Sequence, residues 1–234
     1  MRKLMMTLAV SALAMTSVAC SLNVEQIMAV QPGSAFTIAT VTPIASSANQ
    51  NLEGGAVMNI DIFISLFDLF LGDFEGDITV GEVLIAAPGF PFLGFTGIPT
   101  GIICVAPEEG NPGGGTFEAN LFLKRATFDV ALNTEAIFGS TLVSNLLGGA
   151  LPFPFALEST IPFKLSDALG LFSGSSDLTI TQPVSQPIDL TTAGGPPFGG
   201  IHVTGSITGS ISLSSADAFP TSPLLDDCIE LLAQ

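Results

Sequence analysis

The chain has 234 residues, of which 47% are hydrophobic and 11% are charged, so it can bury a sizeable core and lacks the composition of a disordered protein. After residue 19, three basic residues stand against 21 acidic ones, which gives a formal charge of −18. Such a surface repels phosphate backbones, and nucleic acid is therefore excluded as a partner.

The first 19 residues have the pattern of an export signal. Arg2 and Lys3 precede the uncharged run Leu4–Val18, and small residues occupy positions 17–19, where a signal peptidase reads the chain. The run is shorter than the roughly 20 residues that a helix needs to cross a bilayer, which favours cleavage over a permanent transmembrane helix. We therefore predict a signal peptide over residues 1–19 and an exported protein.

Cys20 directly follows Ser17, Val18 and Ala19. This arrangement resembles the lipobox of bacterial lipoproteins, in which the cysteine becomes the lipidated first residue of the mature protein. Ser17 stands where the lipobox usually has Leu or another aliphatic residue, and the same residues also suit ordinary signal peptidase. The resemblance implies lipid attachment at Cys20 in the bacterial cell envelope, and the alternative is an unmodified periplasmic or secreted protein. It covers only the first 20 residues.

The chain has three cysteines, and an odd number in an oxidising compartment leaves one to be explained. If Cys20 carries lipid, Cys104 and Cys228 remain as a pair. Their disulfide would tie the C-terminal tail to the middle of the domain. The alternative is that both are buried thiols that act as small apolar residues.

Alternating apolar and polar residues predict strands along most of the chain. Residues 20–33 are either a tether or a first strand, and the polar residues 46–55 predict a loop. Strands are predicted over 57–66 and 77–86. Residues 116–132 have the length of two strands, and the apolar phase switches near Lys124, where we expect a bulge or tight bend.

Residues 88–101 form a predicted loop rich in Gly, Pro and Phe. Its aromatic residues are Phe90, Phe92 and Phe95, and Phe has no polar group to satisfy in water. One interpretation is that the loop folds back as a lid on the domain's own core. The other is an exposed apolar contact loop for a membrane or a partner.

A helix is predicted over residues 135–147, where apolar residues recur every four positions and two glycines follow. Residues 201–213 predict the longest strand, with aliphatic side chains on one face and hydroxyl side chains on the other. Gly205 and Gly209 fall on the apolar face, where they would let the strand bend or let another segment approach closely.

No residue pattern typical of catalysis or of a metal site is present in the sequence. His202 is the only histidine and falls on the polar face of the long strand. Neither a Cys-His cluster, a nucleophile elbow nor a phosphate-binding loop occurs. A catalytic role for His202 would require a cleft that also holds a serine and a carboxylate. We predict no catalytic residue, no metal ligand and no cofactor.

These patterns predict an all-β or β-dominated fold: an antiparallel curved sheet, sandwich or open barrel with one or two short helices. Residues 34–234 would form a single β-rich domain. Alternatively, they comprise two diverged halves, about 55–130 and 154–228, because Asp77–Val80 and Asp177–Ile180 have similar sequences and precede similar loops.

The expected protein is non-enzymatic: an exported envelope protein, with or without a lipid on Cys20, that binds an apolar ligand such as a lipid. The alternative is a structural or adhesive β-sandwich protein without a small-molecule ligand. The interior distinguishes the two. A continuous apolar cavity on the order of several hundred Å³ favours the carrier, and native packing density throughout favours the structural protein.

Overall fold

The computed structural model describes residues 19–65, 71–95, 97–164, 166–167, 178–193 and 197–234, so residues 1–18 of the predicted signal peptide lie outside the described chain. Strands dominate it, which confirms the predicted β-dominated fold. They are β1 (Ala19–Val30), β2 (Ala35–Thr42), β3 (Ser46–Asn51), β4 (Glu53–Ser65), β5 (Asp73–Ala87), β6 (Ile103–Pro107), β7 (Gly113–Asn120), β8 (Arg125–Leu132), β9 (Thr134–Phe138), β10 (Leu151–Pro152), β11 (Phe155–Pro162), β12 (Thr179–Thr191) and β13 (His202–Ser215).

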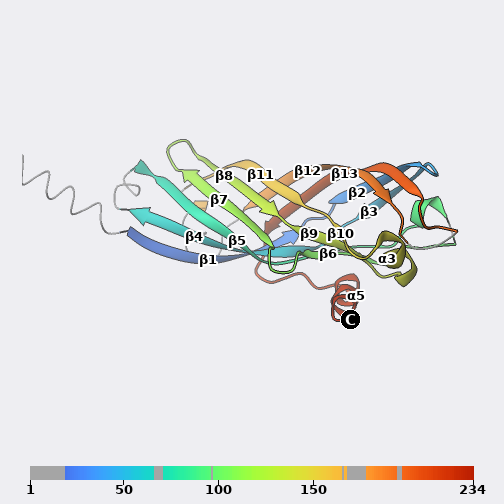
Figure 1. Ribbon diagram of the computed structural model, residues 1–234. Coiled ribbons are helices and arrows are strands. Elements are labelled where there is room, and N and C mark those ends of the chain that lie inside the picture. The colour runs from blue at the N-terminus through green and yellow to red at the C-terminus, as the bar shows by residue number, and fades with distance from the viewer. Residues whose placement is uncertain (1–18, 66–70, 96, 165, 168–177, 194–196) are drawn as a thin grey trace, which may run out of the picture.

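The thirteen strands of the described chain belong to one antiparallel sheet that curls along an elongated body (Figure 1). The main path runs β10-β9-β6-β5-β4-β1-β13-β2-β3. β7, β8 and β11 extend the sheet from β5, and β12 pairs with β13. The polar stretch predicted as a loop over 46–55 instead contributes β3 and the start of β4.

β1 and β2 act as one long strand with an interruption. Both pair antiparallel with β13, so β2 continues in the direction of β1. At the break, the Gln31 backbone N–H donates to the Ser212 carbonyl at 2.7 Å, and the Ser212 N–H donates to the Ser34 hydroxyl at 2.9 Å. Opposite this break, the chain is also interrupted between β3 and β4, at the buried residue Leu52. The resulting hairpin links the two ends of the molecule.

β5 changes its burial pattern halfway along its length. It alternates between buried and exposed residues up to Val80, and the register with β4 then shifts between Val57 and Met58. Residues 83–87 are buried on both faces. The outer face is covered there because the C-terminal helix α5 (Pro223–Leu232) packs Leu225 against Leu84.

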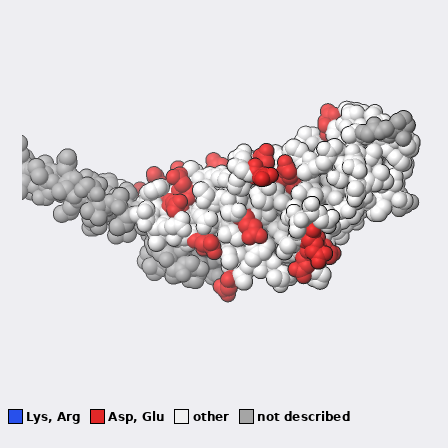
Figure 2. Space-filling model, turned by 60° about the horizontal axis from the view of Figure 1, so that its bottom comes forward, with Lys and Arg blue, Asp and Glu red and all other residues white. Residues whose placement is uncertain are grey.

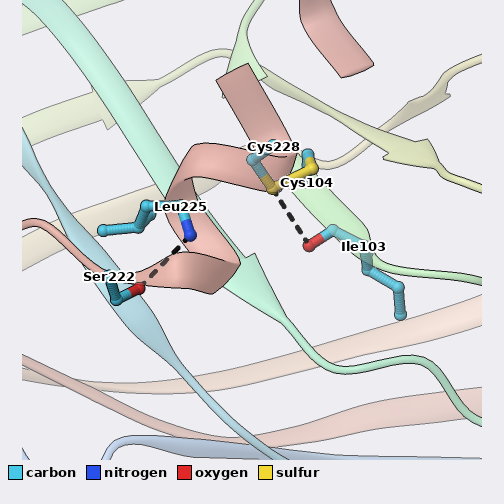
Figure 3. The surroundings of a disulfide bond; sticks show 5 residues. All are labelled: Ile103, Cys104, Ser222, Leu225 and Cys228. Carbon is cyan, nitrogen blue, oxygen red and sulfur yellow. Dashed lines mark hydrogen bonds between the residues drawn. A yellow bond between two sulfur atoms is a disulfide. The ribbon is translucent and has the colours of Figure 1, made fainter. Parts of the chain in front are cut away.

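The predicted disulfide between Cys104 and Cys228 holds α5 against the sheet (Figure 3). Its S–S distance is 2.00 Å, and the Cα atoms lie 5.6 Å apart. The helix begins at Ser222, whose hydroxyl accepts a hydrogen bond from the Leu225 N–H at 3.2 Å. Both cysteines are fully buried, so the bridge lies beneath the helix.

The helix predicted over 135–147 is wrong in its first half. Thr134–Phe138 forms β9, which pairs with β6, and the helix α3 (Thr141–Leu147) begins only after Ser140. The Ser140 hydroxyl accepts from the Val143 N–H and caps the helix. The four-residue apolar spacing is compatible with both structures, and pairing with β6 decides for the strand.

Acidic side chains are spread along the face shown in Figure 2, where no Lys or Arg is visible. Within the described residues, no helix is long and apolar enough to cross a bilayer.

Candidate functional site

A cavity of about 450 Å³ lies at the end of the molecule that carries α3 and the β2–β3 hairpin. One wall comes from β2, which contributes Phe36 and Ile38, and from β3, which contributes Gln50. The opposite wall comes from β5, β6 and β9, which contribute Ile85, Val105 and Ala136. Apolar side chains dominate because these strands turn their buried faces toward each other inside the curled sheet.

The Phe-rich loop closes the end of this cavity. Phe90 and Phe92 line it, and Phe92 belongs to the 3-10 helix η1 (Phe92–Gly94). Phe95 packs edge-to-face on Phe198, with ring centroids 5.8 Å apart. Of the two arrangements considered for the loop, the structure has the one in which these rings lie against the protein's own interior.

Thr100 fastens this loop at its base. Its hydroxyl accepts a hydrogen bond from the Phe90 N–H at 2.9 Å and donates to the Gly101 carbonyl at 2.9 Å. The Thr100 backbone N–H donates to the Phe90 carbonyl at 2.8 Å. Although Thr100 lines the cavity, its hydroxyl is already satisfied by the loop, so it is not the group that meets a ligand.

Gln50 on β3 is the polar side chain that remains available inside the cavity. It is 7% exposed, lies opposite Phe36 in the β2–β3 ladder and lines the cavity. No hydrogen bond joins its amide to another described residue, and since every fully buried side-chain N or O atom of the described chain has a partner, the amide faces the open space of the cavity. The sequence offered no signal for this residue, because it lies in the polar stretch that predicted a loop.

The described lining of the cavity carries negative charge but no positive charge. Among the described residues that line the cavity, none is Lys, Arg or His, and the charged one is Asp189. Asp189 is solvent-exposed on β12, so its carboxylate lies at the rim. The Gln186 amide donates to the Pro154 carbonyl and is already engaged.

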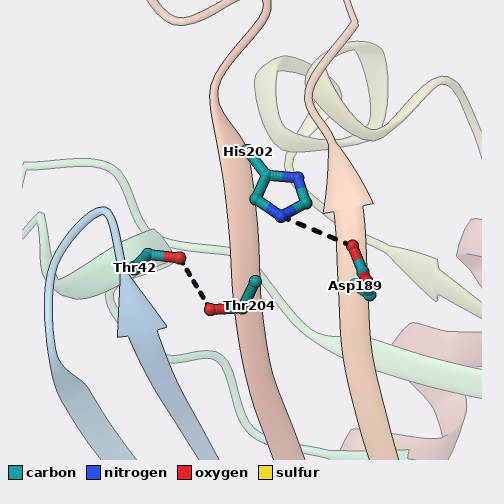
Figure 4. A network of polar contacts seen from close by, with 4 residues as sticks. All are labelled: Thr42, Asp189, His202 and Thr204. Atoms are coloured by element: carbon teal, nitrogen blue, oxygen red, sulfur yellow. Dashed lines mark hydrogen bonds and ion pairs between the residues drawn. The ribbon is translucent and has the colours of Figure 1, made fainter.

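His202 lies on the polar face of β13, as its position in the strand pattern indicates (Figure 4). Its Nε2 atom is 3.6 Å from an Asp189 carboxylate oxygen, and the two side chains are 60% and 76% exposed. An exposed pair of this kind contributes little to stability. Within the described chain, no serine hydroxyl is hydrogen-bonded to His202, and the neighbouring Thr204 hydroxyl pairs with that of Thr42 at 2.7 Å.

The structure places Cys20 second in β1, at the end of the molecule opposite the cavity. Of residues 20–33, which the sequence left open between a tether and a strand, residues 20–30 are part of β1. In the described parts of the chain, no three His, Cys, Asp or Glu side chains come together as metal ligands.

The cavity contrasts with the filled core in the other half of the sheet, where the Phe117 ring packs 5.0 Å from Phe128 and 6.0 Å from Phe163. Two matched substitutions test this difference. We expect Ala136→Phe, which points new volume into the cavity, to change the unfolding free energy by less than about 1 kcal/mol. Ala126→Phe, in the filled half, should cost about 1 to 3 kcal/mol. Urea unfolding monitored by circular dichroism measures both, and equal costs would mean that no cavity exists.

Comparison of the chain with protein-family models, with curated proteins and with solved structures finds no match.

Proposed function

We propose that the protein is an exported, non-enzymatic carrier of the cell envelope that holds an uncharged apolar ligand, such as a neutral lipid, in the cavity at the end of its curled sheet. The observation that carries this proposal is the cavity itself. A volume of about 450 Å³ falls within the range of roughly 300 to 1,000 Å³ that is typical of small-molecule sites. Its lining is apolar with few polar groups, which is the usual composition of such sites.

The lining argues for an uncharged ligand. A carboxylate in this cavity would lose its hydration and would meet no cation among the described lining residues. Asp189 at the rim would repel it further. A hydroxyl or ester group, in contrast, can exchange a hydrogen bond with the Gln50 amide, which both donates and accepts.

The proposal is tested by extraction of the protein purified from its own host. We expect mass spectrometry to find a neutral lipid in about stoichiometric amount. The Ala136→Phe variant should fold and carry none, because the new ring occupies the cavity, whereas Leu142→Phe on the exposed side of α3 should carry as much as the wild type. A wild-type protein without extractable ligand, and without binding of added neutral lipids, would support the structural alternative instead.

Gln50→Leu is expected to raise the stability of the protein and to weaken its binding of ligands that form hydrogen bonds. The substitution removes an unpaired amide from an apolar cavity, so the ligand-free protein should become more stable by about 1 kcal/mol. Dodecanol should bind about 5- to 10-fold more weakly, because one hydrogen bond is lost. Displacement of Nile red measures the affinity, and decane serves as the control, since it makes no hydrogen bond. A loss of stability with unchanged dodecanol affinity would contradict this role for Gln50.

A further inference from the structure

Six strands end together at the pole opposite the cavity. The register pairs the start of β1 with the end of β4, the start of β5 with the end of β7, and the start of β8 with the end of β11. We call this end the tip. The described residues that mark it are Ala19, Ser65, Asp73, Asn120, Arg125 and Pro162.

The tip exposes large apolar side chains. Phe122 and Leu123, in the turn between β7 and β8, are 73% and 60% exposed, and Leu71 beside them is also exposed. The turn holds them outward: the Leu121 N–H donates to the Gly72 carbonyl at 2.8 Å, and the Leu123 N–H donates to the Asn120 side chain at 2.6 Å. Two adjacent exposed side chains of this size are typical of a contact site with an apolar partner.

The same tip carries every Lys and Arg that follows residue 19. Lys124 and Arg125 complete the β7–β8 turn, and Lys164 follows β11. The Phe163 N–H donates to the Lys124 carbonyl at 3.0 Å, which brings Lys164 next to the turn. All three side chains are exposed. In a domain with 21 acidic residues, the positive charge is thus confined to one end.

Two acidic side chains at this end, Asp73 and Asp167, are engaged in local hydrogen bonds. Asp73 accepts from the Asn120 amide, and Asp167 accepts from the Lys164 backbone N–H and from the Ser166 hydroxyl. Glu75 and Glu118 are exposed and face each other across β5 and β7, two residues inside the tip, so they lie about 7 Å behind the ends of these strands. An anionic surface at the tip therefore meets the cations first.

The N-terminal segment connects to the domain at the tip. β1 begins at Ala19, so the described chain starts at the tip (Figure 1). A lipid on Cys20, the second residue of β1, would be attached at this end as well.

We propose that the tip docks on a lipid bilayer, with Phe122 and Leu123 in the interface and Lys124, Arg125 and Lys164 among anionic headgroups. The body then stands away from the membrane. Since Ile85 comes twelve positions after Asp73 along β5, the cavity lies about 40 Å from the bilayer surface. The docking does not depend on any ligand in the cavity.

The absence of Trp from the chain allows a direct test. We expect Phe122→Trp in the full chain to show a blue-shifted emission and quenching by brominated lipid when vesicles of equal phosphatidylglycerol and phosphatidylcholine are added. Val41→Trp, at an equally exposed site (67%) at the cavity end, should show neither. A Phe122→Trp emission that stays unchanged, or equal quenching of both variants, overturns the proposal.

Two further variants separate the tip from a lipid anchor. In a Cys20→Ala background the Trp at position 122 should still be quenched, and loss of quenching would assign all binding to the anchor. Replacement of Lys124, Arg125 and Lys164 by Glu should weaken partition into the anionic vesicles by roughly a hundredfold. Vesicles of pure phosphatidylcholine are the control, because they offer no net negative charge. Unchanged partition into the anionic vesicles would show that the cations play no part.

Discussion

A variant without the disulfide, Cys104→Ala with Cys228→Ala, should have a free energy of unfolding about 4 to 5 kcal/mol lower than that of the wild type. The bridge closes a loop across 124 residues, and in the chain-entropy model a loop of that length restricts the unfolded chain by this amount. For a chain of this size, the midpoint of thermal unfolding should fall by roughly 10 °C. Differential scanning calorimetry measures the change.

Cys20→Ala is the matched control, because it removes a cysteine without opening the bridge, and its unfolding should match that of the wild type. Dithiothreitol should lower the stability of the wild type to that of the double variant and leave the double variant unchanged. A double variant within about 1 kcal/mol of the wild type would mean that packing alone holds α5 on the sheet.

Gly209→Ala is expected to cost roughly 3 kcal/mol, at the upper end of what overpacking costs in proteins. A Cβ atom at position 209 would lie 2.1 Å from the Ala35 carbonyl oxygen of β2, and that atom is backbone that cannot rotate away. β2 would have to separate from β13. Since β2 carries Phe36, which lines the cavity, Nile red binding should also be lost.

Gly97→Ala adds the same methyl group where nothing lies within 4 Å and the backbone does not require glycine. It should change the unfolding free energy by less than about 0.5 kcal/mol. Urea unfolding compares the two variants. If Gly209→Ala were as stable as Gly97→Ala and still bound Nile red, the close approach of β2 to β13 would be disproved.

The strand pattern was predicted well wherever one face of the sheet meets solvent. β4 follows the predicted alternation, β13 follows it at its two ends, and the phase switch near Lys124 is the tight turn between β7 and β8. A period of two is visible there because solvent and core impose opposite demands on successive residues. The duplication of two halves stays a prediction.

The prediction was wrong where pairing with a neighbouring strand decided the secondary structure. Residues 46–51 are polar, and they form β3 because β2 offers a complete ladder of backbone partners. Thr134–Phe138 has helical spacing, and β6 draws it into the sheet. The periodicity of side chains does not show which neighbouring strand is available for backbone pairing, so neither strand could be predicted from the sequence.

For this protein, the sequence by itself determined the acidic surface, the strand-rich fold and the cysteine pair, because composition and local periodicity encode them, and the export signal stays a prediction. The tertiary structure alone decided which apolar residues enclose a cavity, that Gln50 lines it, and that Lys124 and Lys164 come together beside Phe122. The physical reason is that both sites join residues far apart in the chain through the curl and register of the sheet. Those are set by strand pairing, which acts between distant segments.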